Sequence, residues 1–432
     1  MGKQIKVVVV GMGNRANIYS SYSLKYPERL KIVGVVDPDP VRIELAKKRF
    51  GVPQENCFTN LEDFIQRDKF ADAVINGTLD HLHVVTSIPI LRKGYDLLLE
   101  KPFAVNQEEM EQLVRVTNEE KRKVVICHVL RYTPFYRSIK EHLLKKEIGD
   151  IIHIEMAEHV SYHHMAVSYV RGKWRSPKLC HAPMLLAKSC HDLDIMSWML
   201  GNLKPIAVAS FGNDAQFLPD KKPEGAGSRC MADCPYVESC RFSAYTNYIA
   251  HPIRWSNYTW RCLEAEGETD IMRKIASMRT DNPYGKCVWD CERDGNVDHQ
   301  SVVIHFENSV IGTFNMVGGT AVPERKIHII GTLGEITGTF ETSTYTVRKI
   351  DAASASGYSE ETYDLKVSGD MVGAFGGHGG GDERLVEDFV EYMNGAEPSV
   401  SCTDLNDSVL SHRLVFTAES SRKTGKIEWL KK

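Results

Sequence analysis

Residues 6–16 read Lys-Val-Val-Val-Val-Gly-Met-Gly-Asn-Arg-Ala, and this stretch decides the fold. A β-branched run that enters two glycines one residue apart is typical of a buried strand, a tight turn and a helix start. This order suits the pyrophosphate of a dinucleotide, because the free N–H groups of the helix face the anion. Gly11 permits the turn, Gly13 lets the backbone approach the phosphates, and Ala16 lets the helix pack closely on the strand.

A second predicted strand at 30–36 ends in Asp37, about 20 residues after the glycines. A carboxylate at this place accepts hydrogen bonds from the adenosine ribose, which favours NAD. NADP stays open as an alternative. Arg42 is near enough in sequence to pair with a 2′-phosphate, although Asp37 would repel that phosphate.

The whole chain of 432 residues is long enough for two domains and, at 42% hydrophobic residues, for a sizeable core. A formal charge of −4 without a basic stripe argues against nucleic acid as a partner. Neither a signal-peptide region nor a membrane-spanning apolar stretch is present in the sequence, so we expect a cytoplasmic protein with no membrane partner. Eleven cysteines in such a chain favour thiols or metal ligands over a disulfide framework.

Strands and helices alternate over the first part of the chain, which predicts an α/β domain at 1–130 with a parallel, doubly wound sheet. The predicted helices are 41–50, 84–92 and 107–121, and further strands are predicted at 70–76, 96–99 and 123–127. Ligands sit at the carboxyl ends of such strands, so the ends at 11–14, 78–83 and 100–102 point to one crevice. We expect cofactor contacts from Gly11, Met12, Gly13, Asn14, Arg15, Ala16, Asp37, Thr78, His81, His83, Glu100, Lys101 and Pro102.

From about residue 150 the pattern changes, and we expect an α+β domain at 131–432. Strand-like alternation at 151–160 and 301–346, without intervening helices, predicts a mainly antiparallel sheet. Residues 212–295 form a Cys-rich segment that we expect to be irregular, and such long loops tend to be functional. Helices are predicted around 190–200, at 382–393 and at 405–423, with a flexible turn at 376–381.

The glycine turn, the turn at 78–83, Glu100-Lys101-Pro102 and the segment 185–194 together resemble the glucose-fructose oxidoreductase and inositol dehydrogenase (Gfo/Idh/MocA) family. The Glu-Lys-Pro element is the most specific part, because it follows a buried strand at the expected place. In that family the lysine reaches the substrate alcohol beside the nicotinamide, and the proline is typically cis. The resemblance implies a Rossmann domain, then an open antiparallel sheet that shapes the substrate pocket and often an oligomer interface. We therefore expect a homo-oligomer, a dimer or tetramer.

The family also carries a helix start of the form Asp-x-x-x-His-x-x-Asp. His191 and Asp194 match it, but Ala187 stands at the first aspartate and is followed by Lys188. The missing carboxylate normally orients or charge-balances the histidine and binds a sugar hydroxyl, so this chain departs from the family pattern.

Oxidation of a secondary alcohol requires removal of the hydroxyl proton as hydride leaves the same carbon. His191 is the expected base, because histidine titrates near neutral pH, and Lys101 is expected to polarise the oxygen. Lys188 is a third catalytic candidate. It could replace the hydrogen bonds of the lost carboxylate with opposite charge, which would suit a substrate carboxylate or an anionic intermediate.

A group of aromatic and basic residues is expected to shape the sugar site, because aromatic faces pack on sugar C–H faces and Arg or His donate to hydroxyls. The candidates are Arg131, Tyr132, Tyr162, His164, Arg171 and Trp174, together with His191. A packed aromatic core with a solvated arginine is the alternative. Asp298-His299 or the loop at 378–382 could close over the pocket.

The cysteines form a second constellation, with Cys230-x3-Cys234-x5-Cys240 followed by Cys287-x3-Cys291. Where little periodicity holds the backbone, a thiolate-bound ion could do so, which makes a structural zinc at Cys230, Cys234, Cys240 and Cys287 possible. Free buried thiols are the alternative. A closed all-sulfur site leaves no open position for catalysis.

These residues favour an NAD(P)-dependent oxidoreductase that acts on a secondary alcohol of a sugar or polyol. Two other functions stay open. One is an NAD-dependent enzyme that oxidises a sugar transiently and cleaves a glycosidic bond by elimination. The other is a non-catalytic dinucleotide sensor that binds a partner through the Cys-rich segment.

Overall fold

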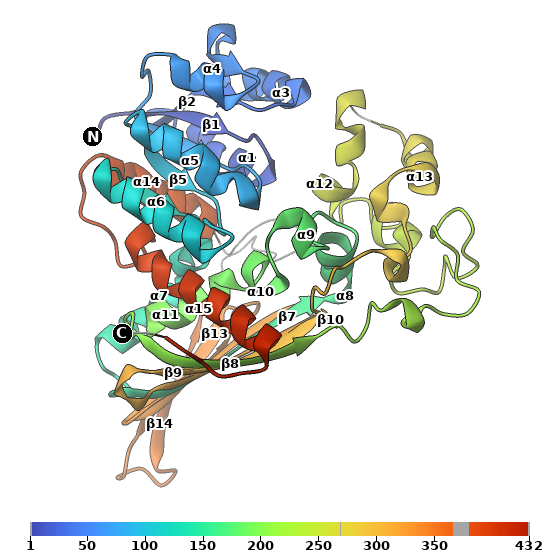
Figure 1. Ribbon diagram of the computed structural model, residues 1–432. Coiled ribbons are helices and arrows are strands. Elements are labelled where there is room, and N and C mark those ends of the chain that lie inside the picture. Colours follow the sequence, from blue (N-terminus) through green and yellow to red (C-terminus); the bar gives the residue numbers. More distant parts are fainter. Residues whose placement is uncertain (1, 268, 366–379, 431–432) are drawn as a thin grey trace. The chain divides into compact units, whose positions relative to one another are not determined.

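The computed structural model describes residues 2–267, 269–365 and 380–430, which form two compact units (Figure 1). The first unit contains residues 2–137 and 380–413. The second contains the other described residues, 138–365 and 414–430. The division falls within the helices α7 (Pro134–Leu144) and α15 (Leu405–Thr424).

The first unit is built on a six-stranded sheet in the order β3-β2-β1-β4-β5-β6, and every neighbouring pair is parallel. Its strands are β1 (Ile5–Val10), β2 (Leu30–Val36), β3 (Cys57–Phe58), β4 (Ala73–Asn76), β5 (Asp96–Leu99) and β6 (Val124–Ile126). The central strands are buried almost throughout, as strands covered on both faces must be. The predicted α/β class with a doubly wound parallel sheet is confirmed.

Helices connect these strands, and their ends follow local sequence signals. They are α1 (Asn14–Ser20), α2 (Tyr22–Lys25), α3 (Pro40–Phe50), α4 (Leu61–Gln66), α5 (His83–Arg92) and α6 (Gln107–Glu119). In α3 the Asp39 side chain accepts a hydrogen bond from the N–H of Val41, Pro40 occupies the first turn, and left-handed Gly51 ends the helix.

The helix α14 (Gly381–Met393) belongs to the first unit although it lies far along the chain. Its Leu385 and Phe389 join the core cluster that contains Val7 and Val9 of β1. Residues 380–413 therefore belong to the first unit, whereas we expected from the sequence that everything after residue 130 lies in the second domain. The apolar spacing of a helix shows that it packs on a core but does not show on which one.

The second unit is built on a nine-stranded sheet in the order β14-β13-β12-β11-β7-β10-β9-β8-β15. Its strands are β7 (Ile151–Ser161), β8 (Pro205–Asn213), β9 (His299–Phe306), β10 (Ile311–Thr320), β11 (Glu324–Gly331), β12 (Gly334–Thr339), β13 (Thr344–Ile350), β14 (Tyr358–Asp364) and β15 (Glu428–Trp429). The β7–β10 pair is parallel, and all the other pairs are antiparallel. The predicted mainly antiparallel sheet of the second domain is confirmed.

Short helices follow β7 and lead into the helix that carries His191. They are α8 (Tyr162–His164), a π-helical turn (Met165–Val170), α9 (Pro177–Cys180), α10 (Met184–Ala187) and α11 (Cys190–Met199). Between the end of β8 at Asn213 and the start of β9 at His299 lies the Cys-rich insert, which contains α12 (Ser256–Thr259) and α13 (Ile271–Thr280). In the described part of the chain, no helix is both long and apolar enough to span a membrane.

Candidate active site

The glycine turn joins β1 to α1 in the first unit. Gly11 has a φ of +80°, and a Cβ there would lie 2.7 Å from the backbone nitrogen of Thr78, so this position requires glycine. At Gly13 a Cβ would meet nothing nearer than the Gly77 oxygen at 3.8 Å. No neighbouring group of the protein therefore requires glycine at position 13, and the backbone at the N-terminus of α1 is left open to a ligand. Ala16 is fully buried beneath this turn.

Asp37 at the end of β2 fixes the turn. Its Oδ2 accepts a hydrogen bond of 2.7 Å from the N–H of Met12, and its Oδ1 accepts one of 2.9 Å from the N–H of Asp39. Arg42 lies with Nη1 4.0 Å from Oδ2 of Asp37 and with Nε 3.5 Å from Oδ2 of Asp39. A 2′-phosphate would meet these two carboxylates, whereas ribose hydroxyls can donate to the lone pairs that remain.

Glu100 at the end of β5 is buried and gathers polar groups around the turn. Its Oε1 accepts hydrogen bonds from Nε of Arg15 at 3.0 Å and from the Tyr19 hydroxyl at 2.6 Å, and its Oε2 accepts one from the N–H of Lys101 at 2.7 Å. Burial opposes ionisation, but the charges of Arg15 and Lys101 outweigh it and hold the pKa of the Glu100 carboxyl below its ordinary value. Arg15 also pairs with Asp382 of α14. Through its Oε2, the Glu100 carboxylate therefore orients the backbone at Lys101.

His83 joins two of the predicted strand ends. Its Nδ1 lies 2.6 Å from the Pro102 carbonyl oxygen, and its Nε2 lies 3.2 Å from that of Thr78. The peptide bond between Lys101 and Pro102 is cis, as the resemblance implied. Lys101 is half-buried in this turn. The turns after β4 and β5 are thus held together within the first unit, as the strand order predicts. His81 is half-buried in the short helix before α5.

His128 follows β6 at the same edge and was not singled out in the sequence. It is fully buried, and its imidazole ring lies 5.8 Å from that of His412, centroid to centroid. Burial, with the charges of Arg131 and Lys101, lowers the pKa of His128 well below its ordinary value, so the ring is neutral. Its position directly after a predicted strand was the signal that could have identified it.

Arg131 and Tyr132, predicted substrate ligands, are both buried in the first unit. Nη1 of Arg131 lies 3.4 Å from the Cys402 carbonyl oxygen, and the Tyr132 hydroxyl donates to Asp388 of α14 at 3.1 Å. Burial, with the nearby Asp388 charge, raises the pKa of Tyr132 well above its ordinary value. The contacts described here are with other residues of the first unit and are typical of a structural role. Their role in binding substrate stays a prediction.

His191 lies in the first turn of α11 in the second unit and is 5% exposed. Lys188, just before α11, has its Nζ 2.9 Å from Oε1 of Glu158 on β7. Arg325 on β11 stands opposite Glu158 in the strand register, pairs with it, and also places Nε 2.9 Å from Oδ1 of Asp192. The charge of Lys188, which follows Ala187, is therefore already matched by the buried carboxylate of Glu158.

Burial shifts the proton affinities of this network. It raises the pKa of Asp192 to about 7, an effect that Glu158 reinforces and that Arg325 and Lys188 oppose. Burial also lowers the pKa of Lys188, while Glu158 acts in the opposite direction. Asp192 thus exchanges its proton near neutral pH, next in sequence to His191.

Three of the residues predicted to shape the sugar site lie beside aromatic rings of the insert. The His164 ring lies 4.4 Å from the Trp255 ring of the insert, and the Trp174 ring lies 6.3 Å from that of Tyr258, centroid to centroid. Tyr162 lies beside Phe242, with ring centroids 6.4 Å apart. The insert thus supplies aromatic neighbours that the sequence analysis did not assign.

The hydrogen-bond partners of Arg171 differ from those that we expected. It is 2% exposed and donates hydrogen bonds to the Lys286 oxygen at 2.7 Å, the Phe242 oxygen at 2.8 Å and the Tyr248 hydroxyl at 3.3 Å. Its guanidinium ties segments of the insert together, which is a structural role rather than the predicted contact with substrate.

Asp298 is also a fixed structural group. It is fully buried, and its Oδ2 accepts hydrogen bonds from the N–H groups of Ala215 and Gln216 at 3.0 and 2.7 Å. Its Oδ1 lies 2.6 Å from Nδ1 of His299. Of the other closing segment we considered, residues 378 and 379 lie outside the described residues.

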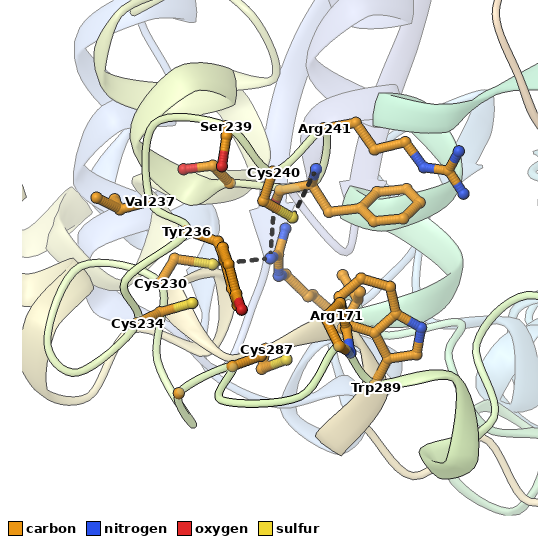
Figure 2. A pocket seen from close by; sticks show the side chains of 16 residues that line it. Arg171, Cys230, Cys234, Tyr236, Val237, Ser239, Cys240, Arg241, Cys287 and Trp289 are labelled. Atoms are coloured by element: carbon orange, nitrogen blue, oxygen red, sulfur yellow. Dashed lines mark hydrogen bonds between the residues drawn. The ribbon is translucent and has the colours of Figure 1, made fainter.

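The cysteines Cys230, Cys234, Cys240 and Cys287 line one cavity of about 290 Å³ in the insert (Figure 2). All eleven cysteines are free. Among residues 2–267, 269–365 and 380–430, no three His, Cys, Asp or Glu side chains are placed to hold one metal ion. The predicted single zinc ion is therefore not supported by this arrangement.

Comparison with known proteins gives matches over both units. The profile described as "Oxidoreductase family, NAD-binding Rossmann fold" (GFO_IDH_MocA) matches residues 5–128. The profile described as "Oxidoreductase family, C-terminal alpha/beta domain" (GFO_IDH_MocA_C) matches residues 140–431.

Two curated relatives illustrate the range of similarity. A putative oxidoreductase of Bacillus subtilis, YteT, is 26% identical over 404 residues, which cover 88% of this chain and 87% of that protein. An inositol 2-dehydrogenase of Leifsonia xyli is 22% identical over 181 residues, 41% of this chain and 47% of that protein.

Two solved structures share the fold. An oxidoreductase of Agrobacterium radiobacter in complex with NAD+, L-tartaric acid and magnesium has a TM-score of 0.67 at 14% identity, covering 99% of this chain and 98% of that one. The WlbA dehydrogenase of Chromobacterium violaceum in complex with NADH and UDP-GlcNAcA has a TM-score of 0.65 at 17% identity, covering 99% and 96%.

Proposed function

Because the chain belongs to the Gfo/Idh/MocA family of NAD-binding oxidoreductases, we propose that it transfers hydride between NAD and a secondary alcohol of a sugar or polyol. The observation that carries the proposal is the connected polar edge of the first unit. There the glycine turn, Asp37 and the Glu100-Lys101-Pro102 turn are joined through Arg15, Tyr19 and His83.

The residues present fit a dinucleotide. Gly13 leaves space at the N-terminus of α1 for the pyrophosphate, and Asp37 offers a carboxylate for the adenosine ribose. When bound, the nicotinamide supplies a hydride acceptor that no side chain provides. The pairing of Arg42 with Asp37 and Asp39 favours NAD over NADP at this position.

Lys101 and His191 divide the acid–base work in this proposal. The Lys101 ammonium donates to the substrate oxygen and stabilises negative charge as the hydroxyl proton leaves, while His191 takes that proton. Glu100 acts through the backbone of Lys101 and is a positioning residue. This division of roles follows from the family resemblance and the residue types.

The substrate we infer is neutral at the reacting end. Lys188 is paired with Glu158, so its charge is matched within the protein and is poorly suited to hold a substrate carboxylate, in contrast to the earlier expectation. The relatives named as inositol dehydrogenases support a polyol-type substrate. A cytoplasmic location and a homo-oligomer remain predictions.

The test is a panel of sugars, polyols and aryl glycosides incubated with purified protein and NAD, with NADH absorbance and released aglycone followed together. We expect NADH formation with at least one sugar or polyol. Aglycone release without net NADH would establish the glycoside-cleaving alternative. If the protein keeps its biological function after each of the substitutions Lys101→Ala and His191→Ala, the sensor alternative would be established.

A further inference from the structure

A closely defined group of thiols lines the cavity in the insert. Cys230, Cys234 and Cys240 reach it from one loop, and Cys287 reaches it from another. Figure 2 shows the four side chains disposed around the same space, with the Arg171 guanidinium among them. Cys230 and Cys287 are buried, while Cys234 and Cys240 are half-buried. The remaining walls come from residues such as Val237, Phe242 and Trp289.

Backbone pairing holds the two cysteine loops in register. The N–H of Cys230 donates to the Gly285 oxygen at 2.9 Å, and the N–H of Cys287 donates to the Ser228 oxygen at 2.8 Å. An antiparallel bridge between Arg229 and Lys286 lies between them. Cys230 and Cys287 are thus fixed next to each other although they are far apart in the sequence.

A buried cation faces the thiols. Nη2 of Arg171 lies 3.3 Å from Sγ of Cys230, and its other donors bind oxygens of the insert. A buried guanidinium favours negative charge on neighbouring sulfur, because the low dielectric strengthens their attraction. The positive charge of Arg171 therefore favours an anionic ligand in this cavity.

The thiols surround a volume and do not converge on a point. No three metal-binding side chains of the described residues could share one ion, yet four cysteines line a cavity of about 290 Å³. A polynuclear centre needs ligands spread in this way, because each metal atom takes its own thiolate. Cys291 is not on this wall, and its Sγ lies 3.3 Å from the Cys287 oxygen.

We propose that this cavity binds a 4Fe–4S cluster ligated by Cys230, Cys234, Cys240 and Cys287. Two ferrous and two ferric ions enter with four sulfides, and each thiol releases its proton to solvent as its sulfur bonds to one iron, so the protein neither gains nor loses electrons. The Arg171 charge partly offsets the negative charge of the four thiolates. Because the site lies in the insert, this proposal does not depend on the dehydrogenase reaction.

The experiment is metal and sulfide analysis of the full-length protein, purified without oxygen from iron-replete cells. We expect about four irons and an equal amount of acid-labile sulfide per chain, with a broad visible absorption that dithionite bleaches. Cys234→Ser and Cys287→Ser should each lose most of that absorption. Cys57→Ser and Cys262→Ser, which change cysteines outside the cavity, should retain it.

Reconstitution guards against variants that fail to fold. Wild-type protein stripped of metal should regain the visible absorption when given equal amounts of ferrous and ferric iron, together with sulfide, without oxygen. Circular dichroism reports whether each variant is folded. Stoichiometric zinc without sulfide, a disulfide among these cysteines, or metal-free protein that does not take up iron and sulfide would each overturn the proposal.

Discussion

The edge of the first unit and the Cys-rich insert of the second are both rich in polar groups, but they are held in place differently. At the edge, Gly11, Asp37 and Lys101 stand at the ends of parallel strands, and regular backbone pairing sets their positions. At the insert, the buried side chains of Asp298 and of Arg171, which lies earlier in the chain, bind backbone groups of distant segments. A repeating scaffold positions the first region, and individual side chains position the second.

Removal of Lys101 should have the largest effect and tests the edge. Lys101→Ala should lower kcat/KM by about 10²- to 10⁴-fold, because a group that polarises the reacting oxygen is lost while the strand pairing is kept. Steady-state kinetics with the best substrate of the panel measures this, with exposed Lys145→Ala as the control. A Lys101→Ala enzyme with wild-type kcat/KM contradicts the proposed role.

Removal of Arg171 tests whether individual side chains hold the insert. Arg171→Ala leaves the oxygens of Lys286 and Phe242 without a buried donor, so we expect a loss of about 1–3 kcal/mol in the free energy of unfolding. Denaturant titration followed by tryptophan fluorescence measures it. Arg241→Ala, an exposed residue of the same cavity wall, should change the stability little. Equal stability of the two variants would remove the contrast between the regions.

Substitution of Asp37 sharpens the description of the edge. Asp37→Ala loses the acceptor for the N–H of Met12 and the carboxylate proposed for the ribose, so the Kd for NAD should rise about tenfold or more. Calorimetric titration with NAD and NADP checks both cofactors. The ratio of the two affinities should move towards NADP, because a repelling charge is removed. An unchanged ratio would show that the carboxylate does not face the ribose.

The last expected effect is a pH dependence in the network beside His191. The pKa of Asp192 is raised to about 7, so the folded protein binds this proton more tightly than the unfolded chain does. The resulting stability is present at low pH and is lost as the pH rises through about 7. As the pH rises from about 4 to about 8, the free energy of unfolding of wild type should therefore fall relative to that of Asp192→Asn. Denaturant titrations across that range measure the difference, and a constant difference contradicts the shifted pKa.

The strand ends that form the edge could be predicted from the sequence because they depend on local patterns. The glycines, the β-branched run and the Glu-Lys-Pro turn each follow from their immediate neighbours and from the rule that parallel strand ends share an edge. The fold class of both domains followed in the same way.

The remaining features depend on distant pairings. The partners of Lys188 are set by the register of β7 and β11, which brings Glu158 opposite Arg325. Arg171 was expected at the substrate because Arg in such a cluster suits sugar hydroxyls, but the insert surrounds it with acceptors. Neither arrangement leaves a periodic signal in the sequence.

The return of α14 to the first sheet has a consequence for biosynthesis. The core that contains β1 includes Leu385 and Phe389, and Arg15 beside the glycine turn pairs with Asp382. A ribosome completes these residues only after more than 380 others have been made. The nascent nucleotide-binding unit therefore keeps an apolar face uncovered until α14 has been made, and chaperones have a defined surface to protect during that interval.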